Sequence, residues 1–249
     1  MKILRLTSIA LIAFAGSALA SDLPSRKAAP AFVPPVPVFT WTGFYAGAQI
    51  GGGWGQSSDY SFVPMDKPRA TGTGVVGGVH AGYNWQVNSL VLGLEGDVEG
   101  TGISKTFDPH QQFPHYNVGD QFNAKVPWQG SLRARAGVAI DRALIYATGG
   151  LAVANIKSYY TYLGGIGFAG GGDYFSATRT GWTMGAGLEY AFADNISARV
   201  EYRYSDFGSK TNHTVNWYST ERNSYTEQAV RIGLTYHFGA PAAAIVANR

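Results

Sequence analysis

The sequence predicts an all-β protein, an eight-stranded antiparallel β-barrel that crosses a membrane with its strands. Three observations lead to this fold class. The 249 residues include 33 glycines, 14% aromatic residues and only 14% charged residues, a poor composition for helices because each interior glycine costs about 1 kcal/mol relative to alanine. Apolar and polar residues alternate in eight runs, which is the period of a strand with two unlike faces. The polar faces of these runs contain no lysine.

The N-terminal segment precedes the predicted barrel and has two parts. Lys2 and Arg5 are followed by an apolar run over 6–14 and by small residues, which predicts a secretory signal peptide over 1–20 with cleavage between Ala20 and Ser21. The apolar run is too short for the roughly 20 residues of a membrane-spanning helix. Residues 21–40 hold five of the eleven prolines and are predicted to form an extended periplasmic linker.

The barrel is predicted to occupy 41–238. The last run is the clearest, because its apolar and polar residues alternate without a break, and a slip by one residue would invert every side chain. One face carries Val230, Ile232, Leu234, Tyr236 and Phe238, and the other carries Ala229, Arg231, Gly233, Thr235 and His237. The eight predicted strands are 43–55, 74–86, 90–99, 128–138, 143–155, 181–192, 196–206 and 228–238.

Short and long connections alternate along this series. Short turns are expected at 87–89, 141–142 and 193–195, with four long loops between the other strands. In bacterial outer-membrane barrels the short turns face the periplasm and the long loops face outward. The pattern therefore predicts an outer-membrane barrel with four extracellular loops and with both chain termini in the periplasm.

The charges on the strands indicate which face is the interior. A soluble β-sandwich, the main alternative, would expose many lysines and glutamates on its polar faces. The strands instead carry five acids and five arginines, a balance suited to mutual pairing in a confined lumen. The predicted ion-pair network comprises Glu95, Asp97, Glu99, Arg133, Arg135, Glu189, Arg199, Glu201, Arg203 and Arg231. Because Glu95, Asp97 and Glu99 share one face, acid–base catalysis is an alternative, but pairing with Arg133 and Arg135 is favoured in so narrow a barrel.

Aromatic residues gather at both ends of the predicted strands and suggest two interfacial girdles. The predicted girdle residues are Trp41, Phe44, Trp85, Tyr190, Tyr236 and Phe238 at the periplasmic ends and Trp54, Trp128, Trp182, Tyr202 and Tyr204 at the outer ends. No segment after the signal peptide is long and apolar enough for a membrane helix. The apolar strand faces are therefore predicted to contact lipid.

Charge and cysteine content exclude several function classes. Without Lys2 and Arg5 the chain has 17 basic and 16 acidic residues, which does not indicate a nucleic-acid partner. The chain contains no cysteine, so it has no disulfide and no thiolate metal site. No His and carboxylate set has convincing metal spacing. We expect no metal and no cofactor.

Four segments resemble the small porin-like outer-membrane proteins of alphaproteobacteria, the surface antigens of the porin family with an OmpA-like transmembrane barrel. They are FTWTGFYAG at 39–47, LGLEGD at 92–97, YATGGLA at 146–152 and VEYRY at 200–204. The resemblance covers the chain from the linker to Phe238. It implies an envelope or surface-antigen role, with porin activity or haemin binding in some members and no catalytic apparatus. Such barrels usually end on the terminal aromatic residue, whereas residues 239–249 form a predicted C-terminal tail here.

These observations predict a non-enzymatic barrel of the outer membrane that contributes to envelope structure. One alternative is a narrow porin for small solutes. Another is binding of haemin or another ligand by the extracellular loops, with His110, His115 and His213 as candidate ligands. The expected partners are outer-membrane lipid and the barrel-assembly machinery, with lipopolysaccharide or haemin as further candidates. We expect that deletion of 239–249 leaves the barrel folded.

Overall fold

The computed structural model describes residues 39–61, 69–107, 118–119, 121–162, 171–213 and 220–238. The predicted signal peptide with its cleavage site at Ala20 and Ser21, nearly all of the predicted linker, and the tail at 239–249 lie outside these residues. Within the described part of the chain there is no helix of sufficient length and apolar character to cross a membrane.

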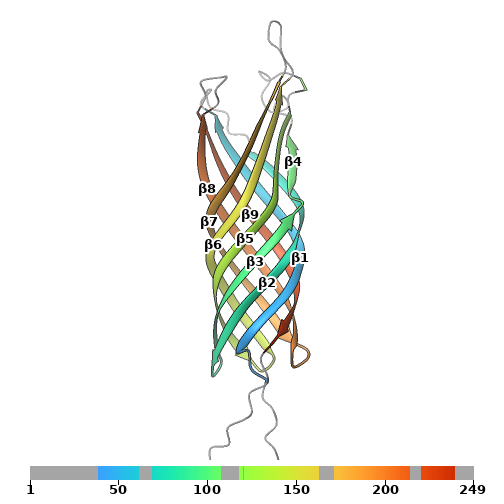
Figure 1. Cartoon of the computed structure of the whole chain (residues 1–249), viewed down its shortest axis with the longest axis vertical. Helices are drawn as coiled ribbons and strands as arrows, with labels where there is room; N and C mark the ends of the chain where they lie inside the picture. Colours follow the sequence, from blue (N-terminus) through green and yellow to red (C-terminus); the bar gives the residue numbers. More distant parts are fainter. Residues whose placement is uncertain are drawn as a thin grey trace, which may run out of the picture. The chain divides into compact units, whose positions relative to one another are not determined.

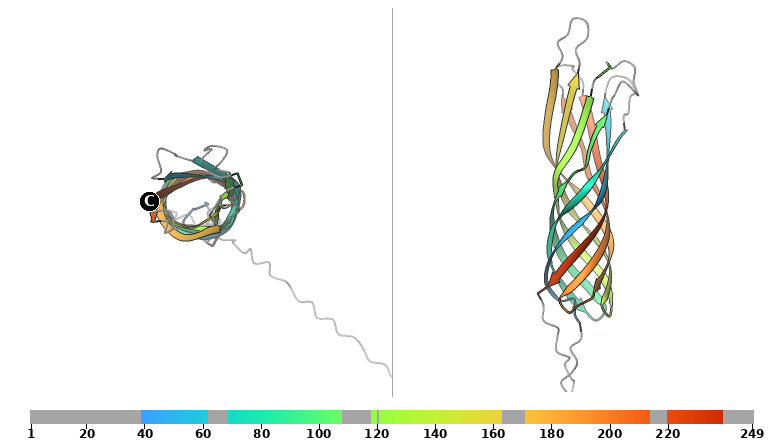
Figure 2. Two further views of the ribbon diagram at one scale, coloured as in Figure 1. Left: turned by 90° about the horizontal axis from the view of Figure 1, so that it is seen from above. Right: turned by 90° about the vertical axis from the view of Figure 1, so that its right-hand side faces the viewer.

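The described chain forms one closed antiparallel sheet (Figures 1 and 2). Its strands are β1 (Gly43–Ser61), β2 (Arg69–Val87), β3 (Leu90–Thr101), β4 (Ser104–Phe107), β5 (Gln121–Ile140), β6 (Ala143–Tyr162), β7 (Gly171–Ala191), β8 (Ile196–His213) and β9 (Thr220–His237). Each long strand pairs with its sequence neighbour, and β1 pairs with both β2 and β9, which closes the ring. Because β4 continues the path of β3 and pairs with the same neighbours, β2 and β5, the barrel is eight-stranded. This confirms the predicted fold class.

Three tight connections join strands at one end of the barrel, the lower end in Figure 1. Asn88 and Asp141 occupy two of them with positive φ angles of 55° and 51°, a conformation that Asn and Asp tolerate better than other non-glycine residues. The third connects β7 and β8 after Ala191. We call this the turn end and the opposite end the loop end.

The strands extend further toward the loop end than the sequence predicted. β6 reaches Tyr162 rather than residue 155, and β7 begins at Gly171 rather than residue 181. The added outward pairs include the polar pair of Lys157 and Ser176 and the exposed aromatic pair of Tyr159 and Tyr174. In this region an apolar residue, Ile156, points inward and a charged one, Lys157, points outward. The pattern of apolar outward and polar inward residues ends there, so it could not reveal these extensions.

The side-chain distribution is the reverse of that in a soluble protein. Along β3 every second residue is buried, including Glu95, Asp97 and Glu99. Leu92 and Leu94, on the opposite face of the same strand, are about half exposed. Leu151 on β6 and Ile232 on β9 are 70% and 61% exposed. Between the two girdles the outward-facing residues are apolar, aromatic or small. This exterior suits a hydrocarbon environment.

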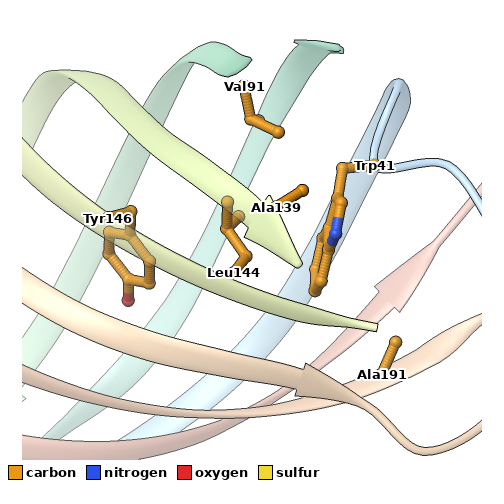
Figure 3. Packing of buried hydrophobic residues seen from close by; sticks show 6 residues of the cluster. All are labelled: Trp41, Val91, Ala139, Leu144, Tyr146 and Ala191. Carbon is orange, nitrogen blue, oxygen red and sulfur yellow. The ribbon is translucent and has the colours of Figure 1, made fainter. Parts of the chain in front are cut away.

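Apolar clusters lie inside the barrel at both ends. The turn-end cluster comprises Trp41, Val91, Ala139, Leu144, Tyr146 and Ala191 (Figure 3). The loop-end cluster comprises Val126, Ala152, Ala154, Ile156, Phe207 and Tyr225. A third, small cluster of Val76, Ile103 and Ala229 lies in the loop-end half. The interior is therefore layered, with charged residues between two apolar layers.

Candidate functional site

The candidate site is the charged middle layer of the lumen. All ten residues that the sequence suggested for an ion-pair network are buried there. They come from β3, β5, β7, β8 and β9, because each of these strands directs alternate residues inward. The network therefore joins strands that are far apart in the barrel wall.

Glu95 and Arg133 lie directly opposite each other on β3 and β5, and their side chains form an ion pair. The other oxygen of Glu95 accepts a hydrogen bond from Arg199 Nη1 at 2.6 Å, across the lumen from β8. The Tyr45 hydroxyl donates to the same oxygen at 3.0 Å. Arg133 also donates to Glu201 at 2.8 Å. Each charge in this group thus contacts at least one opposite charge.

Arg203 connects two further acids. Its Nη1 donates to both oxygens of Asp97, at 2.8 and 3.2 Å, and its Nε and Nη2 donate to Glu201 at 3.1 and 2.9 Å. Asp97 also accepts a hydrogen bond from the Ser131 hydroxyl. All three nitrogens of the planar Arg203 guanidinium group therefore donate hydrogen bonds.

Glu99 and Arg231 form a bidentate pair, with Nε and Nη2 donating at 2.7 and 2.8 Å. Gln129 donates both to Glu99 at 3.0 Å and to Glu227 at 2.8 Å. Sequence reasoning missed Glu227, which lies one residue before the predicted start of its strand. The alternation from Arg231 back through Ala229 would have placed it inward.

Arg179 was missed for the same reason. It lies two residues before the predicted start of 181–192, is 9% exposed, and shares the inward parity of Thr183 and Glu189. With Arg179 and Glu227 included, the buried side chains of the described residues comprise six carboxylates and six arginines. The part of the lumen formed by these described side chains is therefore balanced in formal charge.

A second group of the charged layer lies nearer the turn end. Arg135 pairs with Glu189, and its guanidinium lies 3.8 Å from the ring centroid of Tyr146, a cation–π arrangement. The Ser197 hydroxyl donates to Glu189 at 2.5 Å and lies 2.9 Å from His237 Nε2. These buried contacts connect the charged layer to the turn-end cluster, of which Tyr146 is a member.

The geometry of this layer favours fixed pairing over acid–base chemistry. Glu95, Asp97 and Glu99 are each held by an arginine and are almost completely buried. A general acid or base must reach its substrate within hydrogen-bond distance. Buried ions are tolerated when they are paired and hydrogen-bonded, which is the condition that these residues meet.

The predicted girdle residues lie on the outer surface of the barrel, with the exception of Trp41. The predicted girdle residues that lie outward and at least partly exposed are Phe44, Trp54, Trp85, Trp128, Trp182, Tyr190, Tyr202, Tyr204, Tyr236 and Phe238. Trp41 must be corrected, because it is 1% exposed and belongs to the turn-end cluster. Its backbone N–H donates to the side chain of Gln86 at 2.8 Å, and its ring packs against Phe39 and His237.

The candidate loop ligands remain untested. His110 and His115 lie outside the described residues. His213 ends β8, where its backbone pairs with Thr220, and its side chain is also outside the description. Among the described residues, no group of three or more His, Cys, Asp or Glu side chains is arranged to hold a metal ion.

A closed barrel with an apolar exterior, aromatic rings at two levels and a buried charged interior belongs to the class of transmembrane β-barrels. Comparison with known families agrees with this class and narrows it. The model of the outer membrane protein beta-barrel domain matches residues 7–238, and the chain belongs to this family of outer-membrane proteins.

Characterised relatives extend over nearly the full chain. The 31 kDa outer-membrane immunogenic protein of Brucella melitensis is 36% identical, with 96% of this chain and 100% of the relative covered. The 25 kDa outer-membrane immunogenic protein of Brucella abortus is 34% identical over 96% of this chain and 99% of its own. The 22 kDa outer membrane protein of Rhizobium leguminosarum is 31% identical over 82% of each chain. The resemblance to alphaproteobacterial surface barrels is thereby confirmed.

Solved structures of low sequence identity were also matched. Neisserial surface protein A shares 15% identity, with a TM-score of 0.42, over 79% of this chain and 98% of its own. OprG from Pseudomonas aeruginosa shares 12% identity, with a TM-score of 0.42, over 81% of this chain and 99% of its own.

Proposed function

We propose that this protein is a non-enzymatic, non-conducting surface barrel that contributes to the structure of the outer membrane. The observation that carries the proposal is the layered interior, in which charged side chains lie between two apolar clusters. We place the turn end of the barrel in the periplasm and the loop end outside the cell, as in other outer-membrane barrels.

The layers would hinder ion passage in two ways. Trp41 and Leu144 fill the turn end with apolar side chains, where an ion would lose hydration without gaining a partner. In the middle layer Arg133 binds both Glu95 and Glu201, and an ion would have to displace these contacts. A hollow at the loop end has a mixed lining, with Ile103, Val126 and Ile156 of the apolar clusters beside polar and charged residues. The polar and charged lining residues are Ser57, Ser104, Lys125, Ser158 and Arg179.

Conductance of the purified, folded protein in planar bilayers tests the proposal. We expect no discrete current steps from the wild-type protein. The double variant Arg133→Ala/Glu95→Ala removes a neutral pair and leaves both apolar clusters intact, so it should also be silent. Folding of each sample is checked first by heat-modifiable gel migration. Wild-type steps that disappear when Arg133 is replaced would show a path through the network and would defeat the proposal.

A narrow pore for small solutes is the second candidate, and unpaired polar atoms in the lumen favour it. Both amide atoms of Asn84, Nδ1 of His80, and Nε and Nη1 of Arg135 are buried without a hydrogen-bond partner in the protein. Buried polar groups of this kind are commonly satisfied by internal water. A continuous file of such water would conduct, and the same bilayer recording distinguishes it from isolated molecules.

A further inference from the structure

Two lysines on the outer surface of the barrel lie directly opposite each other. The ladder between β5 and β6 pairs Lys125 with Lys157. Like charges in directly opposed positions destabilise a sheet. A bound anion would reduce the repulsion between the two ammonium groups. Within the described residues neither lysine takes part in an ion pair.

A β-bulge produces this pairing. The register of β5 against β6 shifts between Lys125 and Trp128, so that two residues of β5 stand opposite the single residue Ile156. In an unbroken strand Lys125 would be three residues from the outward-facing Trp128 and would point into the lumen. With the bulge, Val126 is buried in the loop-end cluster and Lys125 is exposed. Bulges often re-aim a side chain in this way.

The pair is flanked by hydroxyl groups in the same row across the sheet. Ser104 of β4 stands opposite Lys125, and Ser176 of β7 stands opposite Lys157. Both serines are exposed. Two ammonium groups between two hydroxyl groups form a surface row of hydrogen-bond donors across four strands, which suits the several oxygens of a phosphate or carboxylate group.

The height of the row on the barrel identifies the source of the anion. Lys125 lies three residues beyond the girdle residue Trp128, which is at most roughly 10 Å along the strand and roughly 7 Å along the normal of a membrane when the strand is tilted by about 40°. The polar layer on each side of the hydrocarbon core is roughly 5 to 8 Å thick. The lysines therefore lie at the level of lipid headgroups.

We propose that Lys125 and Lys157, with Ser104 and Ser176, bind the anionic headgroup of a lipid in the leaflet at the loop end. In an outer membrane with the loops outside, this is the leaflet of lipopolysaccharide. The site depends on the membrane setting of the barrel and is independent of whether the lumen conducts.

Binding of bis-phosphorylated lipid A to the full-length folded protein, measured by native mass spectrometry from detergent micelles, tests this site. We expect Lys125→Gln to weaken binding about fivefold and the double variant with Lys157→Gln about thirtyfold at low salt, from the usual attraction of a basic residue to an anionic surface. Replacement of both lysines by arginine should retain binding. Arg142→Gln removes an exposed cation at the turn end and should leave binding unchanged.

Three results would overturn the proposal. Equal lipid A binding by the wild type and the double glutamine variant would show that the lysines do not hold the headgroup. An equal loss in Arg142→Gln would indicate general charge attraction. Binding of free inorganic phosphate that disappears in the double glutamine variant, without any change in lipid A binding, would identify a soluble anion as the ligand instead.

Discussion

Replacement of Arg133 by methionine should destabilise the barrel strongly. Arg133 is completely buried, pairs with Glu95, and donates to Glu201 at 2.8 Å and to Thr148 at 3.0 Å. The variant would leave two buried carboxylates with one arginine fewer between them, although Glu95 retains Arg199 at 2.6 Å and Glu201 retains Arg203 at 2.9 Å. Removal of one partner from a buried ion pair typically costs about 3 to 5 kcal/mol. We expect a loss of this size in the free energy of unfolding.

The measurement is equilibrium unfolding by urea in phospholipid vesicles, followed by tryptophan fluorescence and by gel migration. Arg142→Met is the matched control, because Arg142 pairs with Asp194 at 2.6 Å while the two side chains are 41% and 68% exposed. Exposed pairs contribute about 0 to 1 kcal/mol. Adding Glu201→Gln to Arg133→Met should reveal a coupling energy of about 1 to 3 kcal/mol. Equal losses in the two methionine variants would refute the role given to burial.

Three further predictions use the same unfolding assay. Trp41→Ala removes a completely buried ring from the turn-end cluster and should lower the free energy of unfolding by about 3 to 5 kcal/mol. A decrease below about 1 kcal/mol would favour the predicted position of Trp41 in the interfacial girdle instead. Ile232→Arg, on the exposed face between the girdles, should cost about 2 to 4 kcal/mol, and Thr226→Arg, above the outer girdle, about 0 to 1 kcal/mol; similar costs would contradict a lipid-facing surface. Gly187→Ala would place a carbon 2.5 Å from the hydroxyl of Tyr146 and 2.6 Å from the backbone oxygen of Val200 and should cost about 1 to 3 kcal/mol by overpacking, whereas an unchanged midpoint would contradict this close packing.

The sequence was most informative where the strands contact lipid. At the turn end, predicted and observed strand ends agree within two residues, as Val87 and Leu90 show on either side of the first turn, because apolar periodicity continues up to a turn of recognisable residues. At the loop end the outward face becomes largely polar while the inward face carries the apolar loop-end cluster, so an apolar outward face no longer marks the strands. Arg179 and Glu227 were missed at that boundary, although each continues the inward parity of its strand.

Two other features depended on tertiary structure. Trp41 has the position of a girdle residue in the sequence, but its backbone is bound by Gln86 from β2 and its ring turns into the barrel. The outward direction of Lys125 depends on the bulge beside Trp128. Pro127 interrupts the run there and is compatible with a bulge, but parity alone would have placed Lys125 inward. The burial of Trp41 depends on β2, and the direction of Lys125 depends on the pairing of β5 with β6. The alternation of residues within one strand could therefore predict neither.

The distribution of charge among the strands has a consequence for how the barrel is made. β3 carries three inward acids, and β5 beside it carries two inward arginines, so this pair of strands can neutralise much of its charge as soon as it forms. Arg203 and Arg231 belong to β8 and β9, and they meet Asp97 and Glu99 only across the lumen. These contacts cannot exist in an open sheet, because they require the curvature that also joins β1 to β9. Closure of the ring is therefore the step at which Asp97 and Glu99 gain their arginine partners from β8 and β9.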